Sequence, residues 1–336
     1  MNAALSPLRL GPLTIDFPVV LAALAGYSDL PYRTICRELG APFATTEVML
    51  DKFLLQEGKL RRHLLRSDAG DHPVGGQIMG ADPAIMARAA VILRDLGFDA
   101  IDLNFACPVK KVVSRKRGGH MMADPEGTLE VIRAVRDAVP DRPLMIKLRK
   151  SFALGDEACE AFWTISRGAW AAGADAICVH ARAVGQMYKG QADWAFLRRV
   201  KEAFPDRTII GSGDVRTPAD ALRMFGETGV DGIAAARGAI GNPWFFRQVG
   251  DLASGREMTA PTLAEQRAVM ERHFALAVEL YGEQKATFVM RHFGISYGRM
   301  HPHAKRIRMA FVAVRSAAEW RAVLDEHYAG ETVPAV

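Results

Sequence analysis

The chain has 336 residues, a formal net charge of +5 and a sequence pI of about 9.1. This length exceeds one ordinary hydrophobic core, so we expect a large domain and a smaller one. The scattered cysteines, Cys36, Cys107, Cys159 and Cys178, lack zinc-type spacing and argue against a disulfide framework. The longest apolar stretch, residues 17–27, is too short to cross a bilayer and follows no signal peptide. We therefore expect a cytoplasmic protein with no membrane partner.

Residues 1–250 repeat one pattern, in which a short apolar run is followed by a loop and an amphipathic helix. Several runs are apolar throughout, which is typical of parallel strands covered on both faces. The runs are residues 18–24, 43–48, 74–79, 100–105, 143–148, 175–180, 208–211 and 232–235. Eight strands separated by helices predict an α/β fold, a (β/α)8 TIM barrel. A doubly wound sheet is the rival, but no GxGxxG motif follows any strand.

The predicted helices of the barrel have clear start and stop signals. An N-cap residue precedes proline at three predicted starts, which are Asp82-Pro83, Asp124-Pro125 and Thr217-Pro218. Gly97 and Gly173 lie where two of the helices are expected to end. The alternation stops near residue 255, so we assign residues 1–255 to the barrel and residues 256–336 to an all-α helical-bundle domain.

The second domain begins with a capping box, Thr262 to Glu265, and continues as two or three further helices broken near Gly294, Gly298 and Pro302. Residues 285–318 contain seven basic residues and no acidic one. Such charge runs are usually solvated helix faces. Because compensating acids are missing from this run, we favour a surface that contacts phosphates of a nucleic acid.

Residues 102–112 are the most informative stretch, because Asn104 and the thiol of Cys107 follow directly on an apolar run. Pro108 prevents the strand from continuing, so both residues fall in a loop on a rigid scaffold, where chemistry usually resides. The following cations, from Lys110 to Arg117, suit an anionic polymeric substrate. The alternative is that Cys107 is a small buried hydrophobic residue.

Polar groups recur at the carboxyl ends of the predicted strands, where TIM-barrel chemistry takes place. Gly213 and Arg237, after the seventh and eighth strands, match the usual phosphate site of such barrels. Lys147 and His180 would point inward as cations, suited to an anionic ring or cofactor. Their joint placement argues against simple packing, because buried polar groups are costly unless paired.

These residues give the chain a resemblance to the tRNA-dihydrouridine synthases, flavoenzymes with an FMN-binding barrel and a C-terminal helical domain. The most specific match is Asn-Phe-Ala-Cys-Pro-Val-Lys-Lys-Val at residues 104–112. The other matching segments are residues 21–33, 46–48, 77–80, 147–149, 180–182, 211–214 and 237–244. The likeness extends from about residue 8 to about residue 325.

The resemblance implies reduction of the C5=C6 bond of uridines in tRNA, with FMN as cofactor and NADPH or NADH as electron donor. It implies that Cys107 is the general acid and that Asn104, Arg149 and Arg182 lie near the uracil. The implied FMN-binding residues are Ala23, Leu24, Ala25, Gln77, Lys147, His180, Ser212, Gly213, Asp214, Ala236 and Arg237. The expected partners are tRNA and a nicotinamide, and the expected state is a monomer with no bound metal.

The chain departs from the family pattern at several positions of the implied site. Alanine stands at residues 106, 181 and 236, where the family usually has glycine, and Ser212 replaces an asparagine. Residues 23–24 are Ala-Leu instead of Pro-Met, and residues 119–122 also differ from the usual Gly-Ser-Ala-Leu pattern. Two alternatives therefore stay open. One is an FMN barrel that acts on a free pyrimidine or an enone, and the other is a non-catalytic RNA-binding paralogue without flavin.

Overall fold

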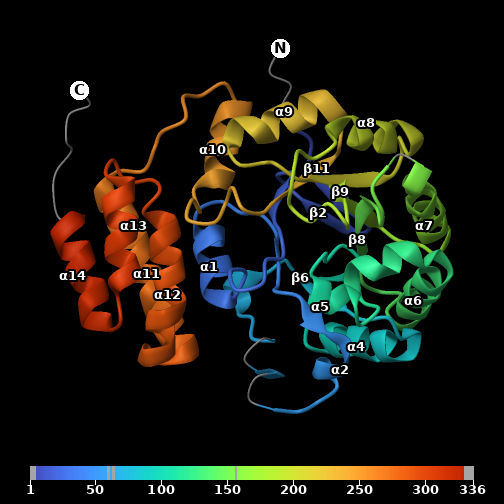
Figure 1. The fold of residues 1–336 in the computed structure, drawn as a ribbon, viewed down its shortest axis with the longest axis horizontal. Coiled ribbons are helices and arrows are strands. Elements are labelled where there is room, and N and C mark those ends of the chain that lie inside the picture. The colour runs from blue at the N-terminus through green and yellow to red at the C-terminus, as the bar shows by residue number, and fades with distance from the viewer. Residues whose placement is uncertain (1–4, 59–60, 63–64, 156, 329–336) are drawn as a thin grey trace.

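A closed parallel barrel forms the larger part of the protein, as the strand–helix pattern predicts (Figure 1). The computed structural model describes residues 5–58, 61–62, 65–155 and 157–328. The barrel strands are β3 (Val19–Leu21), β4 (Ala44–Thr45), β6 (Val74–Met79), β7 (Ala100–Asn104), β8 (Leu144–Ser151), β9 (Ala176–Ala183), β10 (Thr208–Ser212) and β11 (Gly232–Ala235). Pairing of β4 with both β3 and β6 closes the barrel, and the short β5 (Met49–Leu50) extends the second strand position beside β6.

Helices surround the barrel between successive strands (Figure 1). They are α1 (Leu30–Glu38), α2 (Asp51–Leu54), α4 (Pro83–Asp95), α5 (Lys110–Val113), α6 (Pro125–Ala138), α7 (Glu160–Ala171), α8 (Trp194–Ala203), α9 (Pro218–Thr228) and α10 (Phe245–Ala253). The 3₁₀ turns η1 (Ala69–Asp71), η2 (Gly118–Ala123) and η3 (Glu157–Cys159) lie among them. The N-caps predicted at Asp82, Asp124 and Thr217 are confirmed, because each side chain accepts a hydrogen bond from a backbone N–H of the first turn.

Two features of the barrel differ from the prediction. Strands β8 and β9 run three residues past their predicted ends at 148 and 180, so Arg149 and Arg182 are strand residues. A hairpin of β1 (Leu8–Leu10) and β2 (Leu13–Ile15) was not predicted from these short runs. Its apolar side chains share a core cluster with interior barrel residues such as Val20 and Ala100. The hairpin therefore closes the end of the barrel at which the parallel strands begin.

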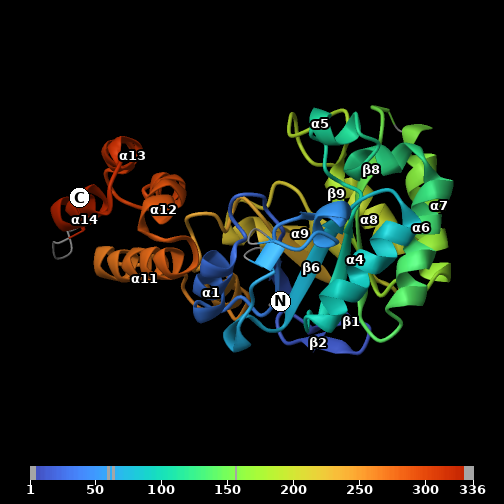
Figure 2. The ribbon, with the colours of Figure 1, turned by 90° about the horizontal axis from the view of Figure 1, so that it is seen from below.

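The C-terminal helices form a separate bundle beside the barrel (Figures 1 and 2). They are α11 (Leu263–Tyr281), α12 (Glu283–Tyr297), α13 (Ala304–Ala313) and α14 (Ala317–His327), and the capping box at Thr262 is confirmed. The predicted helix break near Gly294 is wrong, because Gly294 lies inside α12. A Cβ there would approach Phe311 to 2.5 Å, so the glycine allows close helix packing. No helix in the described ranges is long and apolar enough to span a bilayer.

Helix α1 joins the barrel to the bundle (Figure 2). The ring of Tyr32 lies 4.7 Å from Phe293 and 5.4 Å from His273, which belong to α12 and α11. The hydroxyl of Tyr32 donates to the carbonyl of Ala239 and accepts the N–H of Gly241, both in the loop after β11. One buried side chain therefore connects the first helix, the last barrel loop and the bundle.

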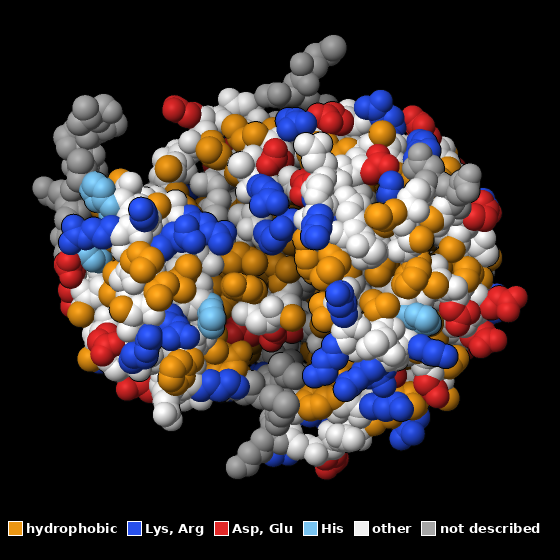
Figure 3. All heavy atoms as spheres, in the orientation of Figure 1, with side chains coloured by type: hydrophobic (Ala, Val, Ile, Leu, Met, Phe, Trp, Pro, Cys, Tyr) orange, Lys and Arg blue, Asp and Glu red, His pale blue; other side chains and the backbone are white. Residues whose placement is uncertain are grey.

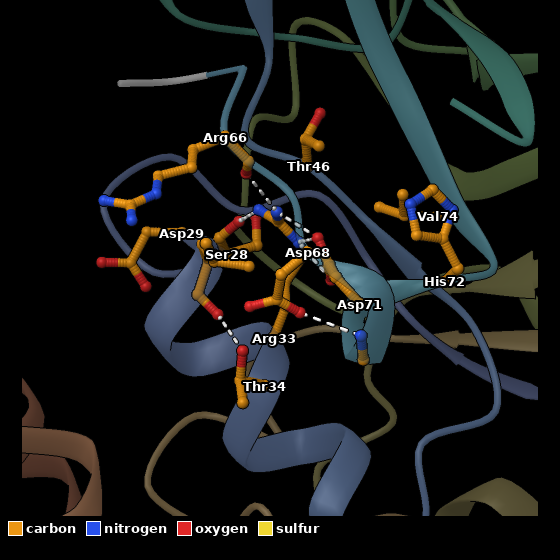
Figure 4. Close-up of polar contacts among 12 residues, drawn as sticks. Ser28, Asp29, Arg33, Thr34, Thr46, Arg66, Asp68, Asp71, His72 and Val74 are labelled. Carbon is orange, nitrogen blue, oxygen red and sulfur yellow. Dashed lines mark hydrogen bonds and ion pairs between the residues drawn. The ribbon is translucent and has the colours of Figure 1, made fainter. Parts of the chain in front are cut away.

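A buried ion pair holds the start of α1 against the segment before β6 (Figure 4). The guanidinium of Arg33 lies 2.5 Å from the Asp71 carboxylate, and both side chains are almost fully buried. Arg33 also donates to the carbonyls of Ser28 and Arg66. These bonds fix the loop that follows β3, which forms one side of the barrel mouth.

Candidate functional site

Inside the barrel, a small cavity of about 10 Å³, room for about one water molecule, brings together three of the residues predicted to bind the cofactor, namely Ala23, Gln77 and Lys147. Asp102 and Cys178, which sequence reasoning did not assign to the site, line the same cavity. The Lys147 ammonium lies 3.3 Å from the Cys178 sulfur. Cys178 therefore lines the site, although the sequence predicts only a packing role for it.

The cysteine loop leaves the barrel at the end of β7. The Asn104 side-chain oxygen accepts the backbone N–H groups of Ala106 and Cys107, each at 3.0 Å, so the loop turns tightly around this amide. A Cβ on Gly118 would lie 3.0 Å from the Cβ of Cys107, and one on Gly119 would lie 2.8 Å from its carbonyl oxygen. These glycines let η2 pack against the loop. The thiol is left half-buried.

Leu24 and Ala25 lie in the turn that follows β3. The N–H groups of Tyr27 and Ser28 both bond to the Leu24 carbonyl, and the Ser28 hydroxyl accepts the Leu24 N–H. Glu47 accepts the N–H of Gly26 and so connects this turn to the segment after β4. Burial raises the pKa of Glu47 above its usual value.

His180 is a neutral imidazole at physiological pH. Burial, reinforced by Arg149, Lys147, Arg182 and Arg237, lowers the pKa of His180 to about 2. Its Nε2 lies 3.3 Å from a guanidinium nitrogen of Arg182. Since an arginine can only donate, Nε2 accepts and the proton resides on Nδ1. His180 is therefore a hydrogen-bond donor through Nδ1, not the inward cation that the sequence predicts.

Arg149 and Arg182 are buried and bonded to loop carbonyls. Arg149 donates to the carbonyls of Ala106, Ala183 and Met187 at 2.7–3.0 Å, which ties the cysteine loop to the loop after β9. Arg182 donates to the carbonyls of residues 189 and 190 and to the Asp214 carboxylate. Both arginines therefore brace the site, and their predicted contact with uracil stays a prediction.

The loops after β10 and β11 form a tight backbone cradle. Gly213 has a φ of +116°, and a Cβ there would come within 2.8 Å of Ala192 and 3.2 Å of the His180 ring. A Cβ on Gly238 would lie 2.7 Å from the Val215 carbonyl. Only glycine fits at these close approaches. Ser212 is buried at the end of β10, and Ala236 is half-buried after β11.

Three arginines surround the Asp214 carboxylate. Arg182 lies at 2.6 Å, Arg237 at 3.7 Å and Arg216 at 3.9 Å. Burial opposes ionisation, but hydrogen bonds from Arg182 and from the Ala192 N–H hold the pKa of Asp214 below its usual value. An anionic carboxylate repels phosphate, so Asp214 can serve a phosphate only by orienting arginines.

Tyr188 is a site residue that sequence reasoning missed. Its exposed ring lies 5.5 Å from the Arg149 guanidinium carbon and 5.7 Å from that of Arg237. It thus lies between the arginine that braces the cysteine loop and the arginine of the cradle. A tyrosine between Gly185 and Gly190, in the loop that follows β9, was the available sequence signal.

Comparison with known proteins gives a consistent match over nearly the whole chain. Residues 20–332 match the family model described as dihydrouridine synthase (Dus). The chain is 32% identical over 308 residues to tRNA-dihydrouridine synthase B of Pseudomonas aeruginosa, covering 91% of each chain. It is 30% identical over 326 residues to tRNA-dihydrouridine synthase B of Proteus vulgaris, covering 96% of this chain and 98% of that one.

Similar solved structures support the fold alone. A 2-naphthoyl-CoA reductase complex matches 76% of this chain with a TM-score of 0.60 at 14% identity. Histamine dehydrogenase from Rhizobium sp. 4-9 matches 81% with a TM-score of 0.57, also at 14% identity. This chain spans about half the length of each, 53% and 51%.

Proposed function

The chain belongs to the dihydrouridine synthase family, and on that basis we propose that it reduces the C5=C6 bond of uridines in tRNA with FMN as cofactor. One observation carries the proposal. Cys107 is half-buried on a loop whose backbone bonds to Asn104, and Asn104 bonds to Gln77, which lines the barrel cavity with Lys147. Hydrogen bonds thus connect the loop of a proton donor to a cavity lined by an amide and a cation.

The residues present fit FMN. The cradle at Gly213 and Gly238, with the exposed side chain of Arg237, suits an anionic phosphate, because such turns and arginines bind anions. The cavity amide of Gln77, the Lys147 ammonium and the Nδ1 donor of His180 suit the polar edge of a flavin ring. The methyl of Ala181 lies in the core cluster that contains Val179 and Phe196, so this departure from glycine leaves the cradle unchanged.

In the proposed mechanism, Cys107 protonates C5 of the uracil. When bound, FMN would supply the hydride that C6 accepts, and NADPH or NADH would supply the electrons that reduce the flavin. Lys147 stabilises negative charge at the ring through its ammonium. Asn104 keeps one amide hydrogen for the base, because its oxygen and its other amide hydrogen already bond within the protein. We further propose that the protein acts as a monomer in the cytoplasm.

We expect Arg237→Ala to weaken FMN binding by roughly 10- to 100-fold, the loss expected when a charge-assisted hydrogen bond is removed. Titration of the flavin-free protein with FMN, followed by flavin fluorescence, measures the dissociation constant. Arg167→Ala is the matched control, because this exposed arginine of α7 pairs with Glu160 and lies away from the cradle. Equal affinities of the two variants would contradict the cradle, and a wild-type protein that never binds FMN would contradict the proposed function.

The tRNA contact is proposed at the basic face of α12 and α13. Lys305 and Arg308 are exposed one helical turn apart, beside the exposed apolar side chain of Met309. Arg306 differs, because it pairs with Glu326 of α14 at 2.9 Å. The sequence run therefore has a compensating acid from another helix, and the prediction narrows to Lys305 and Arg308. Figure 3 shows Lys and Arg side chains over both the bundle and the barrel, around a hollow bordered by hydrophobic atoms.

We expect Lys305→Gln with Arg308→Gln to weaken tRNA binding and to reduce the slope of log K against log salt by about one to two. Filter binding at several salt concentrations measures the slope. Arg133→Gln with Arg167→Gln is the control, because it removes two exposed charges from α6 and α7, on the side of the barrel away from the bundle. A double variant with the wild-type slope would show that this face is only solvated.

A further inference from the structure

Four hydrogen bonds form an uninterrupted chain from the barrel cavity to the catalytic loop. The Asp102 carboxylate accepts the Gln77 amide N–H at 2.6 Å, and the Gln77 oxygen accepts the Asn104 amide N–H at 2.7 Å. The Asn104 oxygen then accepts the N–H groups of Ala106 and Cys107. All three side chains are buried, with at most 7% of their surface exposed.

The donors and acceptors of this hydrogen-bond chain can be arranged in only one direction. A carboxylate can only accept hydrogen bonds, and the backbone N–H groups of the loop can only donate them. The two amides between them must therefore place their nitrogens toward Asp102 and their oxygens toward Cys107. Burial raises the pKa of Asp102 to about 6, against the opposing effects of Gln77 and Lys147, so the group is a carboxylate at neutral pH.

The surroundings of Asp102 indicate a role beyond packing. Its second oxygen has no hydrogen-bond partner among the described residues and lies buried at the cavity that Lys147 and Cys178 also line. A buried carboxylate is costly, and an apolar side chain would fill this position at lower cost. The polar residue therefore needs an explanation, and the hydrogen bond to Gln77 supplies one.

We propose that Asp102 is a positioning residue that acts through Gln77 and Asn104 to hold the loop of Cys107 in place for proton transfer. This inference rests on the proposed function of Cys107. Without an acceptor at position 102, the Gln77 amide is free to rotate. Its oxygen then leaves Asn104, and the Asn104 oxygen is no longer directed at the loop N–H groups.

Amide hydrogen exchange of the cysteine loop tests the proposal without relying on activity. We expect Asp102→Leu to speed exchange at Ala106 and Cys107 by about three- to tenfold, which corresponds to the loss of one net hydrogen bond. Asp102→Asn retains an acceptor oxygen of the same shape, so its exchange should stay within about twofold of the wild type. The measurement uses the full chain, with and without added FMN.

Two control variants distinguish a specific effect on the cysteine loop from a general loss of stability. Asp175→Leu removes a part-buried carboxylate that accepts the Leu144 N–H at the start of β8, and should leave loop exchange unchanged. In a Gln77→Leu background, Asp102→Leu should not speed loop exchange further, because the hydrogen-bond chain is already interrupted at residue 77. Single-turnover reduction of tRNA should slow in Asp102→Leu and recover in Asp102→Asn.

The outcomes are distinct. Loop exchange that is unchanged in Asp102→Leu, or that rises equally in Asp175→Leu, overturns the inference even if the protein reduces tRNA. A protein that shows the expected exchange pattern but never reduces tRNA overturns the proposed function and leaves the hydrogen-bond chain intact.

Discussion

Replacing Cys107 with alanine should slow the reduction of tRNA by roughly 10²–10⁴-fold, the usual loss when a positioned general acid is removed. The Asn104 bonds to the loop involve backbone N–H groups, so the loop keeps its shape without the thiol. Reduction of the enzyme's flavin by NADPH should persist, because that half-reaction needs no proton from Cys107. Anaerobic stopped-flow mixing of reduced enzyme with unmodified tRNA measures the rate.

Cys36→Ala and Cys159→Ala are the matched controls, because both thiols are buried in the core away from the barrel cavity. Cys178→Ala is a poorer control, since its sulfur touches Lys147. Should the Cys107→Ala enzyme reduce tRNA at the wild-type rate, the thiol would be excluded as the acid and Lys110 or His120 would become the candidates.

Replacing Asp71 with alanine should lower the free energy of unfolding by about 3–5 kcal/mol, the cost of leaving a buried charge unpaired. Arg33 has no other carboxylate among its hydrogen-bond partners in the described residues (Figure 4). Urea unfolding followed by circular dichroism measures the change. Asp68→Ala on the same segment should cost only about 1 kcal/mol, as for an exposed cap.

A double variant tests whether the loss comes from the unpaired charge. Arg33→Leu with Asp71→Leu removes both ions together, so most of the stability should return. If the double variant were as unstable as Asp71→Ala, packing around the pair and not its charge would explain the loss.

The barrel could be predicted from sequence because each strand is a continuous apolar run and several helices carry local start signals. The end of β8 could not be placed, since Lys147, Leu148 and Arg149 read equally well as strand or loop. Its continuation to Ser151 depends on pairing with β9, a contact between segments about 30 residues apart. The β1–β2 hairpin was missed for a similar reason, because three-residue strands carry too little pattern.

The candidate site was predicted as a set of residues but not as a network. Motif spacing located Gln77, Asn104 and Cys107 at strand ends. In the structure, Asn104 bonds to Gln77 and also accepts the backbone N–H of Cys107. Sequence could not reveal that Arg149 is bonded to loop carbonyls, because these partners become neighbours only after folding. Asp102 was overlooked since a single acid within an apolar run carries no periodic signal.

Helix α1 makes the boundary near residue 255 a division of the sequence but not of the packing. Tyr32 contacts both α11 and α12, and Tyr281 of α11 donates a hydrogen bond to Asp29 at the start of α1. A chimera that joins the C-terminal helices of one relative to the barrel of another would therefore pack α11 and α12 of the first against an α1 from the second. The segments that should be exchanged together between relatives are the bundle, α1 and the loop at residues 239–241.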